Sequence, residues 1–283
     1  MAKKDNDIRG RVVVITGGAR GIGRATGAGF LRAGARVALG DVDIQLVEKA
    51  AAELAETTGG DVRGLHLDVT RRASFSAFLD DVESQLGPVD VLINNAGIMP
   101  TGLFADETDE MTDRMVAINL GGVLNGSKAA AIRMSGRGGH IVNVASLAGV
   151  SAFPGLATYC ATKHAVVGFT ETLHLELAAL GIAVTVVLPG VVHTQLSAGH
   201  SAPRWVRPIS EVEPEDVAAA IVTAVGRSKT KVAVPQALGT MIKVMGALPD
   251  AARHWIAHAA HFDTTFTHTD PVARAAYHRR LEN

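Results

Sequence analysis

Tyr159 and Lys163 have the residue types and the spacing that could carry out proton transfer. Four residues make about one helical turn, so in a helix the phenol and the ammonium project from the same face. A free tyrosine has a pKa of about 10, and a positive charge beside it favours the phenolate and lowers that pKa. Such a pair can exchange a proton near neutral pH. An isolated pair at this spacing is more often a solvated helix face, so the surrounding elements must decide.

A glycine-rich turn near the N-terminus is the second feature with chemical meaning. The apolar residues 12–15 lead directly into residues 16–23, TGGARGIG, and a helical pattern follows. Glycines between a strand and a helix let the backbone approach a pyrophosphate, which the free N–H groups of the helix N-terminus bind. The spacing is G-x-x-x-G-x-G rather than the usual G-x-G-x-x-G. The position of the turn, more than its glycines, predicts a dinucleotide site.

Asp41 ends the next predicted strand, 18 residues after Gly23. A carboxylate there can accept hydrogen bonds from the adenosine ribose and would repel a 2′-phosphate. Asp43 adds no positive charge, whereas Arg20 in the glycine turn could reach a 2′-phosphate. We weigh Asp41 more heavily and predict NAD, with NADP as the second choice. The alternative is that Asp41 only caps the following helix.

Short apolar runs alternate with helical patterns along most of the chain. We expect strands at residues 12–15, 36–39, 64–67, 89–93, 140–145, 183–188 and 231–234, and helices at 24–33, 44–56, 73–86, 110–135, 159–180 and 215–225. This alternation predicts an α/β fold: a doubly wound, Rossmann-type sheet of seven parallel strands with helices on both faces. Gly27 and Gly29 weaken the first helix, which close packing would explain.

The chain is expected to form one catalytic domain, residues 1–235, and a helical C-terminal extension, residues 236–283. Residues 193–213 have no clear period, and we expect a substrate loop there. Apolar residues recur at helical spacing from Leu238 onwards, which indicates an amphipathic helix. His254, His258 and His261 have a spacing that could bind metal, but no further ligand completes a site, so we expect a solvated face and no metal.

Together these features resemble the short-chain dehydrogenase/reductase family, in its compact single-domain branch, over about residues 11–235. The resemblance implies a catalytic tetrad of Asn119, Ser146, Tyr159 and Lys163. Two positions depart from the family pattern, Ala145 and Cys160, and neither removes a reacting group. The resemblance also implies that the cofactor is held by Gly17, Arg20, Gly21, Ile22, Gly23, Asp41, Asp68, Val69, Asn95, Ala96, Gly97, Tyr159, Lys163, Pro189, Gly190, Val192 and Thr194.

The family chemistry gives each member of the tetrad a role. Tyr159 would be the general base in alcohol oxidation and the general acid in carbonyl reduction. Lys163 would lower the pKa of Tyr159 and hold the nicotinamide ribose. Ser146 would donate a hydrogen bond to the substrate oxygen, and Asn119 would hold a water that connects Lys163 with solvent. A hydride would pass between the substrate and the nicotinamide, with no metal required.

The substrate is expected to be a small alcohol or carbonyl compound, a secondary alcohol or ketone of lipophilic character. This rests on the apolar residues in and near the substrate loop, Met99, Phe153, Leu196, Trp205, Val206 and Ile209. One alternative is a reductase of 3-oxoacyl thioesters, which usually goes with NADP and a basic docking patch. Another is a nucleotide-binding relative without catalysis, which would be expected to lack the tyrosine or the lysine.

Composition excludes several other classes. The 283 residues carry a formal net charge of -1, so the chain has no electrostatic footprint for nucleic acid. No apolar run is long enough for a membrane span, and no signal peptide is recognisable. The single cysteine, Cys160, cannot form an intramolecular disulfide, so we expect a cytoplasmic protein. By the family resemblance we expect a homo-oligomer, a tetramer first and a dimer second.

Overall fold

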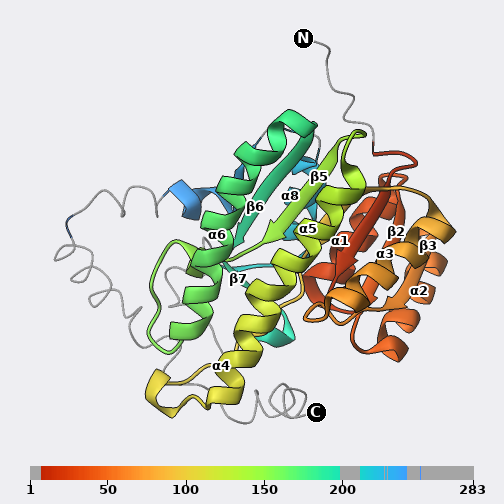
Figure 1. Ribbon diagram of the computed structural model, residues 1–283. Coiled ribbons are helices and arrows are strands. Elements are labelled where there is room, and N and C mark those ends of the chain that lie inside the picture. The colour runs from red at the N-terminus through yellow and green to blue at the C-terminus, as the bar shows by residue number, and fades with distance from the viewer. Residues whose placement is uncertain (1–7, 198–210, 226, 228, 241–248, 250–283) are drawn as a thin grey trace.

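A parallel sheet of seven strands runs through the middle of the molecule, in the order β3-β2-β1-β4-β5-β6-β9 (Figure 1). The computed structural model describes residues 8–197, 211–225, 227, 229–240 and 249. The strands are β1 (Val12–Thr16), β2 (Arg36–Asp41), β3 (Val62–His66), β4 (Val89–Asn94), β5 (Gly139–Val144), β6 (Ile182–Pro189) and β9 (Lys231–Val234). The predicted doubly wound, seven-stranded parallel sheet is thereby confirmed.

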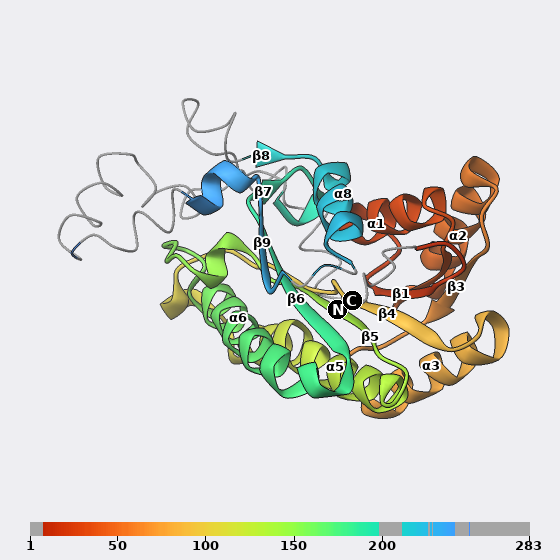
Figure 2. The same cartoon turned by 90° about the horizontal axis from the view of Figure 1, so that it is seen from above.

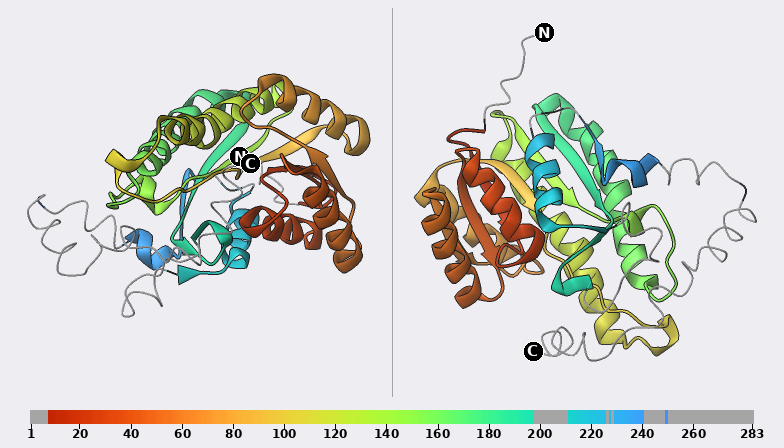
Figure 3. Two further views of the ribbon diagram at one scale, coloured as in Figure 1. Left: turned by 90° about the horizontal axis from the view of Figure 1, so that it is seen from below. Right: turned by 180° about the vertical axis from the view of Figure 1, so that it is seen from behind.

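Helices cover both faces of this sheet, as Figures 2 and 3 show. One face carries α1 (Gly21–Arg32), α2 (Ile44–Thr58) and α8 (Pro214–Ala224). The other carries α3 (Arg72–Leu86), α5 (Gly122–Met134) and α6 (Ala157–Leu177). A shorter helix, α4 (Asp109–Val116), precedes α5. Because β1 is followed by a helix on one face and β4 by helices on the other, the chain reverses its winding between these two adjacent strands.

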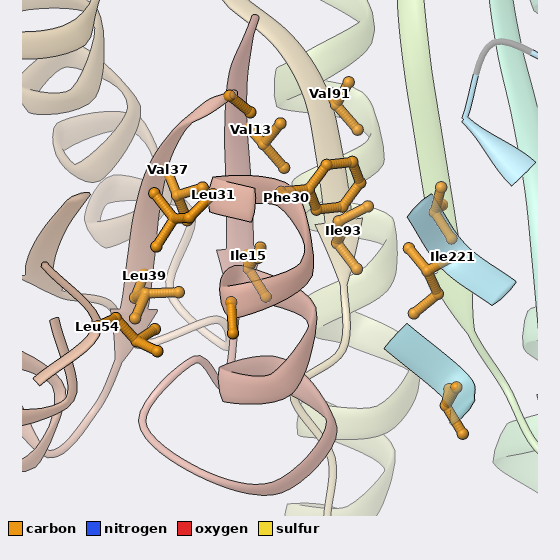
Figure 4. Packing of buried hydrophobic residues seen from close by; sticks show 14 of the residues in the cluster. Val13, Ile15, Phe30, Leu31, Val37, Leu39, Leu54, Val91, Ile93 and Ile221 are labelled. Atoms are coloured by element: carbon orange, nitrogen blue, oxygen red, sulfur yellow. The ribbon is translucent and has the colours of Figure 1, made fainter. Parts of the chain in front are cut away.

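The central strands are buried on both faces, which explains their continuous apolar sequences. In β1, Val13 and Ile15 point into the layer of α1, α2 and α8, whereas Val12 and Val14 point into the opposite layer. Figure 4 shows the first layer, where Val13 and Ile15 lie beneath Phe30 of α1. Burial of each such side chain stabilises the fold by about 1.5–3 kcal/mol.

The two glycines of α1 allow close packing of this helix. A Cβ built on Gly27 would lie 3.0 Å from a methyl carbon of Leu39 in β2. A Cβ on Gly29 would lie 3.2 Å from Val222 in α8. Gly27 therefore lets α1 approach the sheet and Gly29 lets α8 approach α1. The closer packing of α1 against the sheet and α8 offsets the loss of helix propensity that these glycines cause.

A chain of buried polar side chains crosses the middle of the sheet. Asn94 in β4 and Asn143 in β5 are paired in register, and Nδ2 of Asn94 donates to Oδ1 of Asn143 at 2.8 Å. Nδ2 of Asn94 also donates to Ser127 of α5 at 3.1 Å, and Asn143 donates to Thr170 of α6 at 2.9 Å. The four residues are at most 2% exposed. They tie two central strands to the two helices that cover them.

Three differences between the observed and the predicted elements concern the site. The first helix begins at Gly21 rather than at residue 24, so the glycine turn runs directly into its N-terminus. The helix predicted over 110–135 is divided into α4 and α5 by a π-helical turn at Ala117–Gly121. Two short strands, β7 (Val191–Val192) and β8 (Glu211–Val212), pair across the base of the expected substrate loop.

Several predicted features lie outside the described residues. These are most of the helical extension and, by residue, Trp205, Val206, Ile209, His254, His258 and His261. Of the extension, Leu238 is described, and it belongs to the apolar cluster that includes Val186 and Leu188 of β6. In the described part of the chain, no helix is long and apolar enough to cross a membrane. Within those same residues, no group of His, Cys, Asp or Glu could hold a metal ion.

Candidate active site

The candidate site lies at the carboxyl ends of β1 and β4, where the winding of the chain reverses. Open α/β sheets bind their ligands at such a crevice. Thr16, the last residue of β1, joins the two strands, because its Oγ1 accepts hydrogen bonds from the backbone N–H groups of Asn95 at 2.9 Å and Ala96 at 3.0 Å. Nδ2 of Asn95 donates in turn to the carbonyl oxygens of Thr16 and Gly17. The segment after β4 thus fixes the glycine turn.

The glycine turn has no room for side chains. Gly17 has φ +64°, and a Cβ there would lie 2.9 Å from Cα of Ala96. A Cβ on Gly23 would collide with the carbonyl oxygen of Gly17. A Cβ on Gly21 would lie 3.3 Å from Thr194, which follows β6, so two distant segments border one crevice. In the described structure α1 begins without a side-chain cap and without an acidic residue in its first turn, leaving its first N–H groups to an anion.

Asp41 lies beside the glycine turn. Its Oδ2 accepts a hydrogen bond from the backbone N–H of Ala19 at 3.2 Å, and its Oδ1 accepts one from that of Asp43 at 3.3 Å. The cap of α2 is Asp43, which accepts from the N–H of Leu46 at 3.1 Å. The alternative reading of Asp41 as the helix cap is therefore wrong. Its carboxylate instead faces the turn that would hold the dinucleotide.

Asp68 and Val69 form the turn that follows β3. Oδ1 of Asp68 accepts hydrogen bonds from the backbone N–H and the hydroxyl of Thr70, at 3.0 and 2.6 Å. Val69 is buried, and a Cβ on Gly122 of α5 would lie 2.8 Å from its side chain. The carbonyl of Val69 accepts from Nδ2 of Asn125. These bonds fix the turn against the start of α5.

Tyr159 and Lys163 lie on the buried face of α6, as the helical spacing predicts. Their exposed fractions are 6% and 4%, so this is not a solvated helix face. Nζ of Lys163 lies 5.6 Å from the centroid of the Tyr159 ring and donates to the carbonyl oxygen of Val144 at 3.0 Å. Burial lowers the pKa of Lys163 to about 8. Burial thus makes the positive charge of Lys163 energetically unfavourable, and this charge lies next to the phenol of Tyr159.

Asn119 is centred in the π-helical turn between α4 and α5. Its Oδ1 accepts from the N–H of Ile98 at 2.8 Å, and its Nδ2 donates to the carbonyl of Ile98 at 2.9 Å and to Thr162 at 3.3 Å. A Cβ on Gly97 would lie 3.2 Å from Oδ1 of Asn119 and 3.7 Å from Nζ of Lys163. Asn119, Gly97 and Lys163 are thus brought together. Because both amide hydrogens of Asn119 are used, a water held by this residue would bind to one of its oxygens.

Ser146 follows β5 and starts a short 3-10 turn, Leu147–Gly149. Its Oγ accepts a hydrogen bond from the backbone N–H of Ala148 at 3.1 Å, which leaves the hydroxyl hydrogen to donate. A Cβ on Gly149 would lie 2.7 Å from the carbonyl oxygen of Lys163, so the turn packs directly on α6. The turn that begins at Ser146 is thereby held against α6, the helix that carries Tyr159 and Lys163.

The segment after β6 borders the crevice from the other side. The N–H of Gly190, next to Pro189, donates to the carbonyl of Val234 in β9 at 2.8 Å. Val192 is buried, and its carbonyl accepts from the N–H of Thr194 at 2.8 Å. Figure 2 shows β7 and β8 on the same side of the sheet as α8.

Comparison with known proteins identifies the family. A family model described as short chain dehydrogenase matches residues 11–205. The chain belongs to the short-chain dehydrogenase family. A structure of a family member from Burkholderia phymatum in complex with NAD is similar, with a TM-score of 0.77 and 26% identity over 85% of this chain and 94% of the other. A short-chain dehydrogenase from Mycobacterium marinum has a TM-score of 0.72 and 27% identity, over 81% of this chain and 95% of the other.

Curated relatives carry the names of oxidoreductases. The "Probable oxidoreductase EphD" of Mycobacterium tuberculosis is 36% identical over 260 residues, which cover 86% of this chain and 44% of EphD. This chain therefore spans less than half the length of EphD. The "2-(S)-hydroxypropyl-CoM dehydrogenase 3" of Xanthobacter autotrophicus is 41% identical over 66% of this chain and 73% of its own length. A "Sorbitol dehydrogenase" of Cereibacter sphaeroides is 40% identical over 65% of this chain and 71% of its own length.

The short-chain dehydrogenase family uses a nicotinamide cofactor, and the residues of this chain fit one. The glycine turn leaves a cradle that a Cβ at Gly17 or Gly23 would fill. The uncapped start of α1 suits a pyrophosphate, and Asp41 stands where ribose hydroxyls would bind.

An apolar cluster surrounds Tyr159. Met99, Met115, Leu156 and Cys160 are buried with Tyr159, and the partly buried Ile98, Phe153, Val191 and Leu196 pack against them. Of the residues expected to border the substrate, Met99, Phe153 and Leu196 are therefore brought together. Burial raises the pKa of the Cys160 thiol, so Cys160 behaves as a small buried apolar residue rather than a reactive thiolate.

Two contributors to the site were missed by sequence reasoning. Thr162 links Asn119 to α6, since it accepts from Asn119 and donates to the carbonyl of Tyr159 at 2.8 Å. No sequence signal marks it, because a threonine inside a helix usually bonds to its own backbone. Asp43 was considered only for its charge. Its role as the cap was readable, because an aspartate directly before a helical pattern is a common N-cap.

Proposed function

We propose that this chain is an NAD-dependent oxidoreductase that interconverts a secondary alcohol and a ketone, with Tyr159 as the general acid and base. The observation that carries the proposal is the buried ammonium of Lys163, 5.6 Å from the phenol ring. When bound, the nicotinamide accepts or supplies the hydride. The protein residues hold the substrate oxygen, move its proton and exclude water.

The phenol and the ammonium act together. While Lys163 is protonated, its charge favours the phenolate form of Tyr159, which can then take the proton of an alcohol. The apolar surroundings strengthen this effect, because the two groups interact in a medium of low dielectric constant. The carbonyl of Val144 holds Nζ of Lys163 in place. In ketone reduction the same phenol would return its proton to the oxygen.

Ser146 and Asn119 complete the proposed chemistry. The free hydrogen of Ser146 would donate to the substrate oxygen and stabilise the negative charge that develops there. Asn119 lies close to Lys163 across Gly97, in the right place to hold a water that carries the proton away. Its hydrogen bonds to Ile98 and Thr162 fix that position.

NAD is the proposed dinucleotide because of Asp41. Its carboxylate is held beside the glycine turn by the N–H groups of Ala19 and Asp43, where it suits ribose hydroxyls and would repel a 2′-phosphate. The neighbour from Burkholderia phymatum is described as a complex with NAD. NADP is the second choice. This argument also weighs against a 3-oxoacyl thioester reductase that uses NADP.

A lipophilic substrate is proposed from the apolar cluster around Tyr159. Met99, Phe153 and Leu196 come from three separate segments and converge there. The names of the relatives do not narrow the substrate further, since one is named for 2-(S)-hydroxypropyl-CoM and another for sorbitol.

Replacement of Tyr159 by Phe tests the catalytic part of the proposal. Loss of a general acid and base typically costs 10²–10⁴-fold, so we expect turnover to fall at least about 100-fold. The assay follows reduced nicotinamide by absorbance with secondary alcohols, ketones, sorbitol and a 3-oxoacyl thioester, each with NAD and with NADP. The matched control is Tyr277→Phe, which removes the hydroxyl of the other tyrosine of the chain and shows whether the loss is specific to Tyr159.

Each result of this assay has a meaning. Near wild-type turnover by Tyr159→Phe would refute the role of the phenol. A strong preference of the wild type for NADP would refute the argument from Asp41. Binding of dinucleotide without turnover of any compound would favour the alternative, a nucleotide-binding relative without catalysis.

We also propose a homo-oligomer, a tetramer before a dimer. In support, large apolar side chains are exposed on three helices of one side of the sheet: Val116 of α4, Leu124 and Ile132 of α5, and Leu175 of α6, the last two at 67% and 76%. Figure 1 shows these helices next to one another. Exposed apolar surfaces commonly mark contacts between subunits. A monomer in sedimentation velocity would refute this proposal.

The single cysteine supports a reducing, cytoplasmic location. Cys160 is buried and cannot pair within the chain. Fractionation of cells that express a tagged full-length chain would test this, and recovery outside the cytoplasm would refute it.

A further inference from the structure

Two aspartates and an arginine form a small network where the glycine turn meets α2. Both oxygens of Asp41 are engaged by backbone N–H groups, those of Ala19 and Asp43. Asp43 uses Oδ1 to cap α2, and its Oδ2 lies 3.8 Å from Nη2 of Arg20. Asp43 is thus held in place by its own backbone and by the helix it caps. Its second oxygen is left to attract the guanidinium of Arg20.

A cleft of about 240 Å³ opens at this point, between the glycine turn with the start of α1 and the side of α2 that carries Leu46, Lys49, Ala50 and Glu53. Three cationic residues line it, Arg20, Arg24 and Lys49, together with the carboxylate of Glu53. Arg24 is paired with Glu53 at 2.8 Å, as Arg20 is with Asp43. Lys49 makes no ion pair within the described residues. Each of the two arginines in this cleft is therefore paired with a carboxylate.

We propose that Asp43 is a second determinant of dinucleotide choice, which withholds Arg20 from the 2′-phosphate of NADP. This inference rests on the proposed use of NAD and deepens it. Arginine is well suited to bind phosphate, since its planar guanidinium can donate two parallel hydrogen bonds. A free Arg20 in the glycine turn would compensate the repulsion between a 2′-phosphate and Asp41. When Asp43 holds Arg20, the guanidinium no longer compensates this repulsion.

The effect of Asp43 is expected to be moderate. The side chains of Arg20 and Asp43 are 39% and 49% exposed, so solvent screens their attraction. Removal of the negative charge of Asp43 acts through Arg20, because it frees the guanidinium to bind the phosphate. We expect the ratio of the Kd for NADP to the Kd for NAD to fall about three- to fivefold.

The test is Asp43→Asn, which removes the charge and keeps the cap, since asparagine caps helices as well as aspartate does. Isothermal titration calorimetry of the full chain with NAD and with NADP gives the ratio of the two Kd values at one ionic strength. The same titrations are made for Glu53→Gln, which frees Arg24 in the same cleft, and for the double variant Asp43→Asn with Arg20→Gln. We expect an unchanged ratio for Glu53→Gln and a wild-type ratio for the double variant.

Three results would overturn the inference. These are an unchanged ratio in Asp43→Asn, an equal fall in Glu53→Gln, and a gain for NADP that survives the loss of Arg20 in the double variant. None of them affects the proposed function, which requires only that the wild type binds NAD more tightly than NADP. Conversely, a wild type that prefers NADP would overturn the choice of NAD in the proposed function and the inference with it. Thermal melting of each variant confirms that α2 remains folded.

Discussion

Two charged regions of this member of the short-chain dehydrogenase family differ in how deeply their charges are buried. At the end where adenosine would bind, Asp41, Asp43 and Arg20 are partly or fully exposed; backbone N–H groups hold the two carboxylates, and Asp43 attracts Arg20. At the end where hydride would be transferred, Lys163 is buried beside Tyr159 and donates a hydrogen bond to the carbonyl of Val144. Burial makes a charge costly and its influence on a neighbour strong, whereas exposure makes both small. The first region can therefore select a ligand, and the second can lower the pKa of the tyrosine.

The largest expected effect comes from Lys163→Met. Turnover should fall at least about 100-fold, because the charge that favours the phenolate is gone. The variant should nevertheless be more stable at neutral pH. Burial lowers the pKa of Lys163 from 10.5 to about 8, a penalty of about 3 kcal/mol. Loss of the bond to Val144 offsets part of it, so the net gain is about 1–2 kcal/mol.

The gain in stability of Lys163→Met depends on pH. The folded protein binds the proton of Lys163 less tightly than the unfolded chain does. The penalty is therefore complete below pH 8 and disappears as the pH rises from about 8 to 10.5. Unfolding by urea at pH 7 and at pH 10 measures the difference, with the exposed Lys49→Met as control. A variant less stable than the wild type at pH 7 would contradict the prediction.

A comparison of two glycines sharpens the role of the glycine turn. Gly17 and Gly59 have almost the same backbone angle, φ +64° and +67°. A Cβ on Gly17 would meet the backbone of Ala96 at 2.9 Å, whereas one on Gly59 would meet nothing within 4 Å. Gly59→Ala should cost about 1 kcal/mol from the backbone angle alone and leave NAD binding intact. Gly17→Ala should cost more, about 2–3 kcal/mol, and abolish NAD binding.

Thermal melting and calorimetric titration with NAD measure both glycine variants. Equal losses of stability with intact binding would show that the turn tolerates a side chain. That result would remove the steric part of the argument for a dinucleotide cradle.

The smallest effect is expected at His193, between β7 and β8. Its Nδ1 lies 2.6 Å from Oε1 of Glu213 and its Nε2 lies 3.0 Å from Oε2 of Glu211. These hydrogen bonds, with Glu213 the stronger influence, raise the pKa of His193. Its contribution to stability is therefore present below the unfolded pKa of about 6.5 and is lost as the pH rises through the higher folded value. Because His193 is exposed, this contribution is at most about 1 kcal/mol.

Melting temperatures of the wild type and His193→Gln between pH 5 and 9 test this. The difference in melting temperature between the wild type and His193→Gln should shrink as the pH rises. His164→Gln serves as the comparison, because the ring of His164 bonds to the carbonyl of Cys160 and not to a carboxylate. A difference that grows with pH would contradict the expected sign.

The sequence predicted the elements whose signals are local. Continuous apolar strands, the glycine turn and the one-turn spacing of Tyr159 and Lys163 all depend on neighbouring residues, and the sheet and the buried face of α6 follow from them. The π-helical turn around Asn119 could not be predicted, because it depends on hydrogen bonds with Ile98, which is distant in sequence. The same holds for β7 and β8, two residues each, which are too short to show a period.

Asp41 and Asp43 show where local reasoning stops. The sequence places both near the turn, and either could cap α2. Which one does so depends on the end of β2, because Asp41 is still paired within the sheet, with His66 as its partner. That pairing turns Asp41 towards the glycines and leaves the cap to Asp43.

The paired amides of Asn94 and Asn143 bear on how the chain folds. A slip of one residue between β4 and β5 would turn one of the amides into the opposite, apolar layer. An amide without partners there would cost about 1–3 kcal/mol. Misaligned sheets are therefore penalised at their centre, where apolar strands alone would pair almost equally well in several alignments. The polar pair thus favours the native register of β4 and β5 over a shifted one.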